Sequence, residues 1–139
     1  MSKLLKRAKV KLHNSLHNYH LIAEDDAYLD DCCYNLQQAM ELALKFLVEI
    51  HGEPYIRNHD LRAQLNKLNM LGIEVPYYEE ISRMAATLNS WEAESRYKDS
   101  FSALIDEIDA AAEYAKALIS FAENKVKEIE NGSGCITDF

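Results

Sequence analysis

The stretch LDDCCYNLQQAMELALKFLVEI, residues 29–50, carries a helical pattern that decides the fold of this chain. Apolar side chains recur there at intervals of four and three without a break, at Leu29, Cys33, Leu36, Met40, Ala43, Leu47 and Ile50. Cys32, Ala39 and Phe46 widen the stripe, as is typical of a helix that packs against neighbours on two sides. Gly52 is a natural C-terminal stop, with Pro54 beyond it. We therefore expect a central helix here.

Four further stripes with helical spacing flank this segment, over residues 5–23, 61–68, 81–88 and 101–129. No convincing period-two segment bounded by turns accompanies them, and the connections between the stripes are short. The sequence therefore predicts an all-α fold, an antiparallel bundle of about five helices. We expect the second and fifth helices to form its core pair, because alanines in the last stripe permit close approach.

The boundaries of the later helices rest on weaker signals. Asn58 can cap the third helix, which should end near Gly72. The segment 89–91 should loosen the fourth helix, and Asp99 or Ser100 should cap the fifth. Arg96 and Tyr97 would then close an irregular segment just before the last helix.

Length and composition favour one domain. The chain has 139 residues, 48% of them hydrophobic, with only four glycines and two prolines. We expect a single bundle over residues 1–130 and a flexible C-terminal tail over 131–139. No run of about eighteen apolar residues predicts a membrane span, and the N-terminal segment lacks the apolar core of a signal peptide. A cytoplasmic location without membrane contact follows as the expectation.

Charge and cysteine usage argue against several kinds of site. The net charge of −8 disfavours a broad electrostatic grip on nucleic acid. The three cysteines show neither a disulfide framework nor CxxC spacing for zinc. His13, His17 and His20 share one helix face without an accompanying HExxH motif, so we interpret them as a solvated face. We expect no metal and no cofactor.

Three segments together resemble the HEPN domain family, in the family's order and spacing. They are YNLQQAMELALKFLVEIHG (34–52), RNHDLRAQL (57–65) and SRY (95–97). In the family's second helix a Gln-Gln pair precedes a small residue, then Glu and Lys. The corresponding residues are Gln37, Gln38, Ala39, Glu41 and Lys45. The resemblance covers roughly residues 3 to 130.

The resemblance implies an all-α bundle, a homodimer and a role linked to a nucleotide or RNA. Many members are encoded beside a small nucleotidyltransferase as toxin–antitoxin-like pairs, which implies a nucleotidyltransferase-type protein partner. Active members are metal-independent ribonucleases that use an arginine followed four to six residues later by a histidine. In this sequence no histidine follows Arg96, and the last one is His59.

Three functions remain open from the sequence. The first is a non-catalytic or weakly active HEPN-like binding component of a two-component nucleotidyltransferase system. The second is a metal-independent ribonuclease toxin that combines Arg96 with a base from elsewhere, such as His59. The third is a purely structural protein-interaction module.

The candidate residues have structural interpretations as well. Candidate catalytic residues are Arg96 and His59, and candidate ligand-binding residues are Lys45, Gln38, Glu41 and Tyr97. Arg96 would either grip a phosphate or pair with Glu92 or Glu94 while Tyr97 packs in the core. His59 would act as a base or simply stand in the first turn of a helix beside Asp60. Gln38, Glu41 and Lys45 share one face, which would either line a pocket or bond to the His59 or Arg96 segments.

Overall fold

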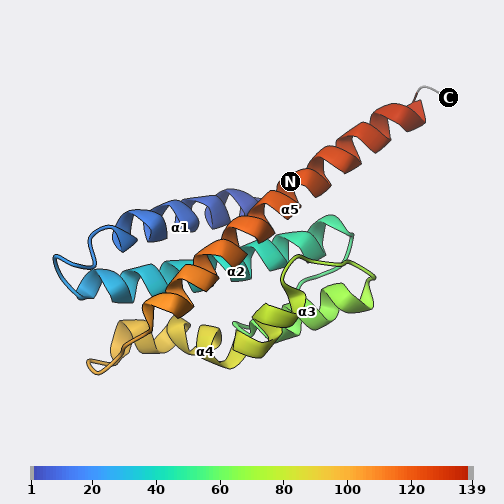
Figure 1. The fold of residues 1–139 in the computed structure, drawn as a ribbon. Helices are drawn as coiled ribbons and strands as arrows, with labels where there is room; N and C mark the ends of the chain where they lie inside the picture. The colour runs from blue at the N-terminus through green and yellow to red at the C-terminus, as the bar shows by residue number, and fades with distance from the viewer. Residues whose placement is uncertain (1, 138–139) are drawn as a thin grey trace.

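The computed structural model describes the backbone of residues 2–137 and the side chains of residues 2–131. Its five helices are α1 (Leu4–Tyr19), α2 (Ala27–Ile50), α3 (Leu61–Met70), α4 (Tyr78–Tyr97) and α5 (Ile105–Thr137), shown in Figure 1. No strand occurs between residues 2 and 137, so the predicted all-α bundle is confirmed. Within this described part, no helix combines the length and apolarity that a membrane crossing requires.

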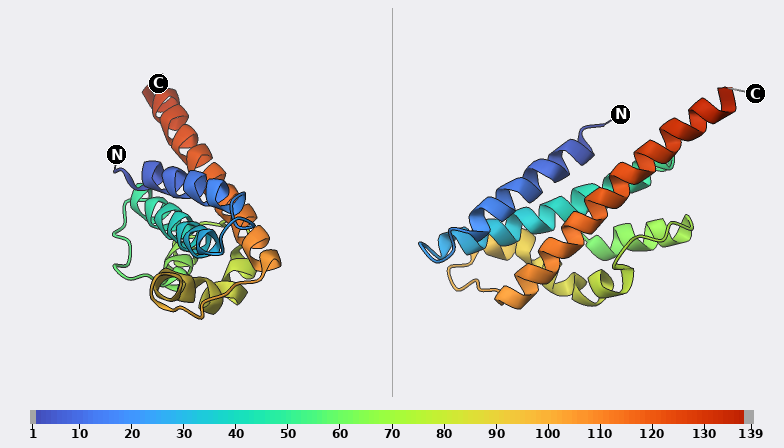
Figure 2. Two further views of the ribbon diagram at one scale, coloured as in Figure 1. Left: turned by 90° about the vertical axis from the view of Figure 1, so that its left-hand side faces the viewer. Right: turned by 45° about the horizontal axis from the view of Figure 1, so that its top comes forward.

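Helix α2 lies at the centre of the bundle and packs against all four other helices. Its predicted stripe is buried, with Cys33, Leu36, Met40 and Leu47 almost fully enclosed. We expected α5 to be its main partner, but its most extensive contact is with α1. Both views in Figure 2 show α1 running alongside α2 while α5 crosses the bundle at an angle. A crossing helix meets its neighbour over a shorter length than a nearly aligned one.

The start of α3 corrects one predicted boundary. The N-cap is Asp60, whose Oδ1 accepts a hydrogen bond from the Arg62 amide at 3.0 Å. Asn58 lies before the cap, and its Oδ1 accepts from the Asp60 amide at 3.0 Å. The prediction that Asn58 caps the helix is therefore wrong, because this asparagine shapes the preceding turn. Gly72 follows the helix with φ of 77°, in agreement with the expected end.

Helix α4 runs without interruption through residues 89–91, where we expected it to loosen. Trp91 is buried in the core. The Asn89 side chain accepts a hydrogen bond from the Leu61 amide at 3.0 Å and donates to Asp60 Oδ1 at 2.8 Å. Burial and these bonds to α3 hold the segment in the helix, so tertiary contacts override its weak local propensity.

Helix α5 begins at Ile105, so Phe101 lies in the connection before it and neither Asp99 nor Ser100 caps it. The Glu107 side chain instead accepts from the Leu104 amide at 3.1 Å, as the acid of a capping box does. Phe101 still packs against the core from the connection. The backbone helix continues to Thr137, and Figure 1 shows it extending past the other helices. Residues 138–139 lie outside the described part, and flexibility of 131–139 stays a prediction.

Tyr77, just before α4, adopts a left-handed backbone conformation with φ of 58°. A residue with a Cβ pays a steric cost there, so its surroundings must compensate. The Tyr77 hydroxyl donates to Glu113 of α5 at 2.7 Å, and its ring contacts Tyr114 with centroids 4.8 Å apart. The start of α4 is thus attached to α5 by one side chain.

Candidate functional site

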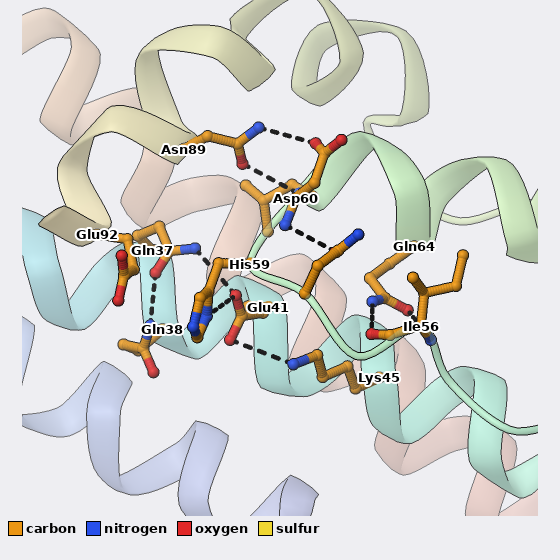
Figure 3. Close-up of polar contacts among 12 residues, drawn as sticks. Gln37, Gln38, Glu41, Lys45, Ile56, His59, Asp60, Gln64, Asn89 and Glu92 are labelled. Carbon is orange, nitrogen blue, oxygen red and sulfur yellow. Dashed lines mark hydrogen bonds and ion pairs between the residues drawn. The ribbon is translucent and has the colours of Figure 1, made fainter.

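Four polar side chains line one face in the middle of α2: Gln37, Gln38, Glu41 and Lys45, here called the α2 polar strip. Their spacing of three and four residues places them along adjacent helical turns. Gln37 and Glu41 are buried, and the Lys45 side chain is only 11% exposed. Figure 3 shows this strip facing the segment that precedes α3. Because buried polar groups require hydrogen-bond partners, the side chains of this strip must be paired with one another or with neighbouring segments.

The Glu41 carboxylate is the centre of the strip. Its Oε1 lies 3.0 Å from His59 Nδ1 and accepts from Gln37 Nε2 at 3.4 Å. Its Oε2 lies 3.6 Å from Lys45 Nζ. Three donors therefore compensate a carboxylate that is 2% exposed, as a buried charge demands. The expectation that this face bonds to the His59 segment is met in these contacts, which Figure 3 draws as dashed lines.

His59 is positioned from the loop between α2 and α3, directly before the cap Asp60. Its side chain is 62% exposed although one ring nitrogen contacts the buried Glu41. When the Glu41 carboxylate is ionised, the N–H at His59 Nδ1 donates a hydrogen bond to it. The other ring nitrogen, Nε2, is then left for a ligand or solvent. A carboxylate that fixes the tautomer of a histidine is also the arrangement that orients a general base.

Arg96 occupies the last turn of α4. The prediction that it stands in an irregular segment at the mouth of the last helix is wrong. Its Nη2 lies 2.7 Å from Glu92 Oε1, and its Nε donates to the Glu92 backbone oxygen at 2.8 Å. Its guanidinium carbon lies 4.7 Å from the Tyr34 ring centroid and 5.0 Å from that of Tyr97. Of the two interpretations of this pair, the structure shows the pairing of Arg96 with Glu92, but Tyr97 is 76% exposed and does not pack in the core.

Among the described residues, Arg96 and His59 share no hydrogen-bonding or ionic partner. Arg96 is bound by Glu92 of its own helix, whereas His59 is bound by Glu41 of α2. Lys45, Gln38 and Glu41 do come together with His59, since Gln38 Nε2 donates to Gln37 Oε1 at 2.7 Å. The structure thus joins most candidate residues into one polar network and leaves Arg96 and Tyr97 beside it.

Two aromatic residues at the ends of the α2 polar strip were missed from the sequence. Tyr34 lies one turn before Gln38, and both Arg96 and Lys11 of α1 approach its ring. Tyr55 lies in the loop after α2, with its ring centroid 5.3 Å from Lys45 Nζ. The only sequence signal for Tyr34 was its four-residue spacing from Gln38. Cations near an aromatic ring are attracted by its π face.

His13, His17 and His20 are exposed along α1 and at its C-terminal end, in agreement with the interpretation of a solvated face. Cys32 and Cys33 are buried and free. Burial, with Asp109 nearby, raises the pKa of the Cys32 thiol to about 12, and burial raises the pKa of Cys33 as well. Within residues 2–131, no three His, Cys, Asp or Glu side chains are grouped as a metal site requires. Cys135 lies outside the described side chains.

Comparison with known proteins identifies the family. The sequence matches the HEPN domain model over residues 1–131, so the chain belongs to the HEPN domain family and the resemblance seen in its motifs is confirmed. It is also similar to the crystal structure of TT1696 from Thermus thermophilus, with a TM-score of 0.60 and 26% sequence identity. That alignment covers 90% of this chain and 99% of TT1696. Among proteins with curated descriptions, none matches.

Proposed function

We propose that this protein is a non-catalytic or weakly active binding component of a two-component nucleotidyltransferase system, with a role linked to a nucleotide or RNA. Membership of the HEPN family supports this assignment. The main observation in favour of a non-catalytic role is the ion pair between Arg96 and Glu92 within α4, with Nη2 2.7 Å from Oε1.

Metal-independent RNA cleavage needs a base for the 2′-hydroxyl and cations placed on the phosphate. In this chain Arg96 is paired with Glu92 of its own helix, and no histidine follows it in the sequence. His59 is the candidate base in the motif set, but in the described part of the chain it shares no hydrogen-bonding or ionic partner with Arg96. These features favour binding over cleavage.

The partner assignment is tested by co-expression with any nucleotidyltransferase that is encoded beside this protein, one of the two carrying an affinity tag. We expect the two chains to elute together through affinity and size-exclusion steps. A control lane carries the tagged protein with an unrelated nucleotidyltransferase. Separate elution of the true pair, or no such neighbouring gene, would count against the proposal.

A homodimer forms part of the same proposal. Tyr97, Leu104 and Ile105 surround the connection between α4 and α5 and are 76%, 69% and 45% exposed. Large apolar side chains left in solvent close together in sequence are typical of an association surface. We expect this connection to be covered by a second copy of the chain.

A metal-independent ribonuclease is the second candidate, because one observation favours it. The 3.0 Å pair between His59 and Glu41 has the geometry of an oriented base. The purified protein would be incubated with structured and single-stranded RNAs in the presence of a chelator. Cleavage abolished by both His59→Ala and Arg96→Ala would favour the enzyme, and intact RNA would exclude it for those substrates.

A further inference from the structure

The α2 polar strip ends at a surface pocket of about 270 Å³ beside the loop that joins α2 to α3. Five residues line this pocket: Lys45, Tyr55, Arg57, Asn58 and His59. Lys45 comes from α2 and the other four from the loop. The pocket is separate from Arg96, which lies near Tyr34 toward the opposite end of the strip.

The side chains around the pocket are rich in hydrogen-bond donors with remaining capacity. Arg57 is exposed and has no ion-pair or side-chain hydrogen-bond partner in the described part of the chain. Lys45 Nζ lies 3.6 Å from Glu41 Oε2, longer than a tight charge-assisted bond, so the ammonium has donors to spare. Asn58 uses its Oδ1 to accept from the Asp60 amide, which leaves its NH2 group for another partner.

The acidic group that balances this charge lies beneath the pocket and not in its lining. Glu41 is 2% exposed and binds Lys45 and His59 from below. None of the five lining residues carries a carboxylate. A chain with a net charge of −8 thus presents two basic side chains, an amide and a histidine in one concave place. Such a lining favours an anion over a cation or a neutral ligand.

We propose that this pocket binds the phosphate monoester group of a nucleotide or of a 5′-phosphorylated RNA end. The five donors of a guanidinium match phosphate oxygens. A phosphate monoester has three terminal oxygens, for which the Arg57 guanidinium, the remaining donors of Lys45 and the Asn58 amide are suitable partners. The proposal rests on the proposed function in one respect, the link to a nucleotide or RNA, and it names the group that is recognised. It requires neither catalysis by Arg96 nor a protein partner.

The test is an NMR titration of the full chain, observed through backbone amide shifts at fixed ionic strength. The probes are inorganic phosphate, a nucleoside 5′-monophosphate, the nucleoside alone, and one short RNA with and without a 5′-phosphate. We expect saturable shifts centred on residues 55–60 with inorganic phosphate, the nucleoside 5′-monophosphate and the 5′-phosphorylated RNA. We expect none with the nucleoside. Tighter binding of the mononucleotide identifies a free nucleotide as the source, and tighter binding of the phosphorylated RNA identifies an RNA end.

Two matched variants test the assignment of residues. Arg57→Gln removes the unpaired guanidinium and should weaken phosphate binding about tenfold or more. Arg83→Gln removes another exposed guanidinium, which lies on α4 beside Glu80, and should change the affinity less than about twofold. Shifts that do not saturate, shifts centred elsewhere, or equal losses in both variants would overturn the proposal.

This outcome is independent of the co-purification experiment. If the protein binds phosphate but not the nucleotidyltransferase, the phosphate pocket is supported and the partner assignment is rejected. A protein that binds the nucleotidyltransferase but shows no saturable phosphate shifts retains the partner assignment and loses the pocket.

Discussion

His59 Nδ1 lies 3.0 Å from Oε1 of Glu41, so a half-exposed loop histidine is bound to one of the most deeply buried carboxylates of the bundle. The contact fixes the loop between α2 and α3 against the central helix. It also determines which histidine nitrogen faces outward. Both the candidate base and the candidate phosphate pocket depend on this pair.

Replacement of Glu41 should be the most damaging change in the polar network. Glu41→Ala leaves Lys45 nearly buried without its counter-charge, and we expect it to lower the free energy of unfolding by about 3–5 kcal/mol. Urea denaturation followed by circular dichroism measures this change. Glu80→Ala, which breaks an exposed pair with Arg83, should cost well under about 1 kcal/mol. Equal losses in the two variants would mean that burial does not distinguish these carboxylates.

The cap of α3 should be coupled energetically to α4. Asp60→Ala and Asn89→Ala should each destabilise the fold by about 1–2 kcal/mol, since each leaves a helix N–H without its acceptor. The two side chains are 2.8 Å apart, so the double variant should lose less than the sum. A double-mutant cycle measures the coupling. Strict additivity would contradict the contact between these residues.

Arg96→Ala should have a small effect on stability, on the order of 1 kcal/mol or less. The side chain is 37% exposed, and its ion pair with Glu92 lies within a single helix. Thermal unfolding compares it with Arg83→Ala as the matched surface change. A loss above about 3 kcal/mol for Arg96→Ala alone would show that this arginine ties α4 to α2 through Tyr34.

Alkaline pH should destabilise the protein through its buried thiols. The Cys32 pKa is about 12 in the folded chain against an ordinary value of 9.0, and burial is the main cause. Above pH 9 the unfolded chain therefore loses protons that the folded chain keeps. The stabilising contribution is complete below pH 9 and is lost as pH rises toward 12.

Urea denaturation at a series of pH values from 8 upward measures this loss, in a Cys135→Ser background that leaves only the two buried thiols of α2. The control replaces Cys32 and Cys33 by alanine, and its stability should decline less steeply with pH. Parallel pH dependences in the two proteins would assign the decline to other groups, such as Tyr19 and Tyr77, whose pKa values are raised by hydrogen bonds to Asp109 and Glu113.

The homodimer is tested at the connection between α4 and α5. Leu104→Asp should convert a dimer into a monomer, because a carboxylate cannot be buried cheaply in an apolar interface. Size-exclusion chromatography with light scattering measures the mass. Met70→Asp changes another exposed apolar residue, at the end of α3, and should leave the dimer intact. A wild-type monomer would remove this part of the proposed function.

The fold was predictable where local periodicity and burial agree. The stripe from Leu29 to Ile50 identified α2 because its apolar spacing persists over the whole helix. The boundaries at 89–91 and 101–104 were wrong for the opposite reason. The Asn89 side chain accepts a hydrogen bond from the start of α3, a tertiary contact that local propensity does not contain. The Leu104 amide donates to Glu107, a local contact that sets the start of α5 after the first residues of the apolar stripe.

The site was predictable only in part. Helical spacing placed Gln38, Glu41 and Lys45 on one face, but it left open what covers that face. The answer depends on where a loop crosses it, and that loop supplies His59 and Tyr55. Arg96 was misplaced because its helix does not break where the local sequence is weak.

The left-handed conformation of Tyr77 bears on the order in which the chain folds. A free tyrosine disfavours this backbone geometry by an amount of order 1–3 kcal/mol. The groups that hold it, Glu113 and Tyr114, belong to α5, which is synthesised later and lies far along the chain. The left-handed turn before α4 is therefore stabilised only after α5 has packed against it. In a mutational analysis of the folding transition state, we expect substitutions in this turn to change mainly the unfolding rate, because the turn forms late. The α1–α2 pair should form earlier, because its two helices are neighbours in the sequence.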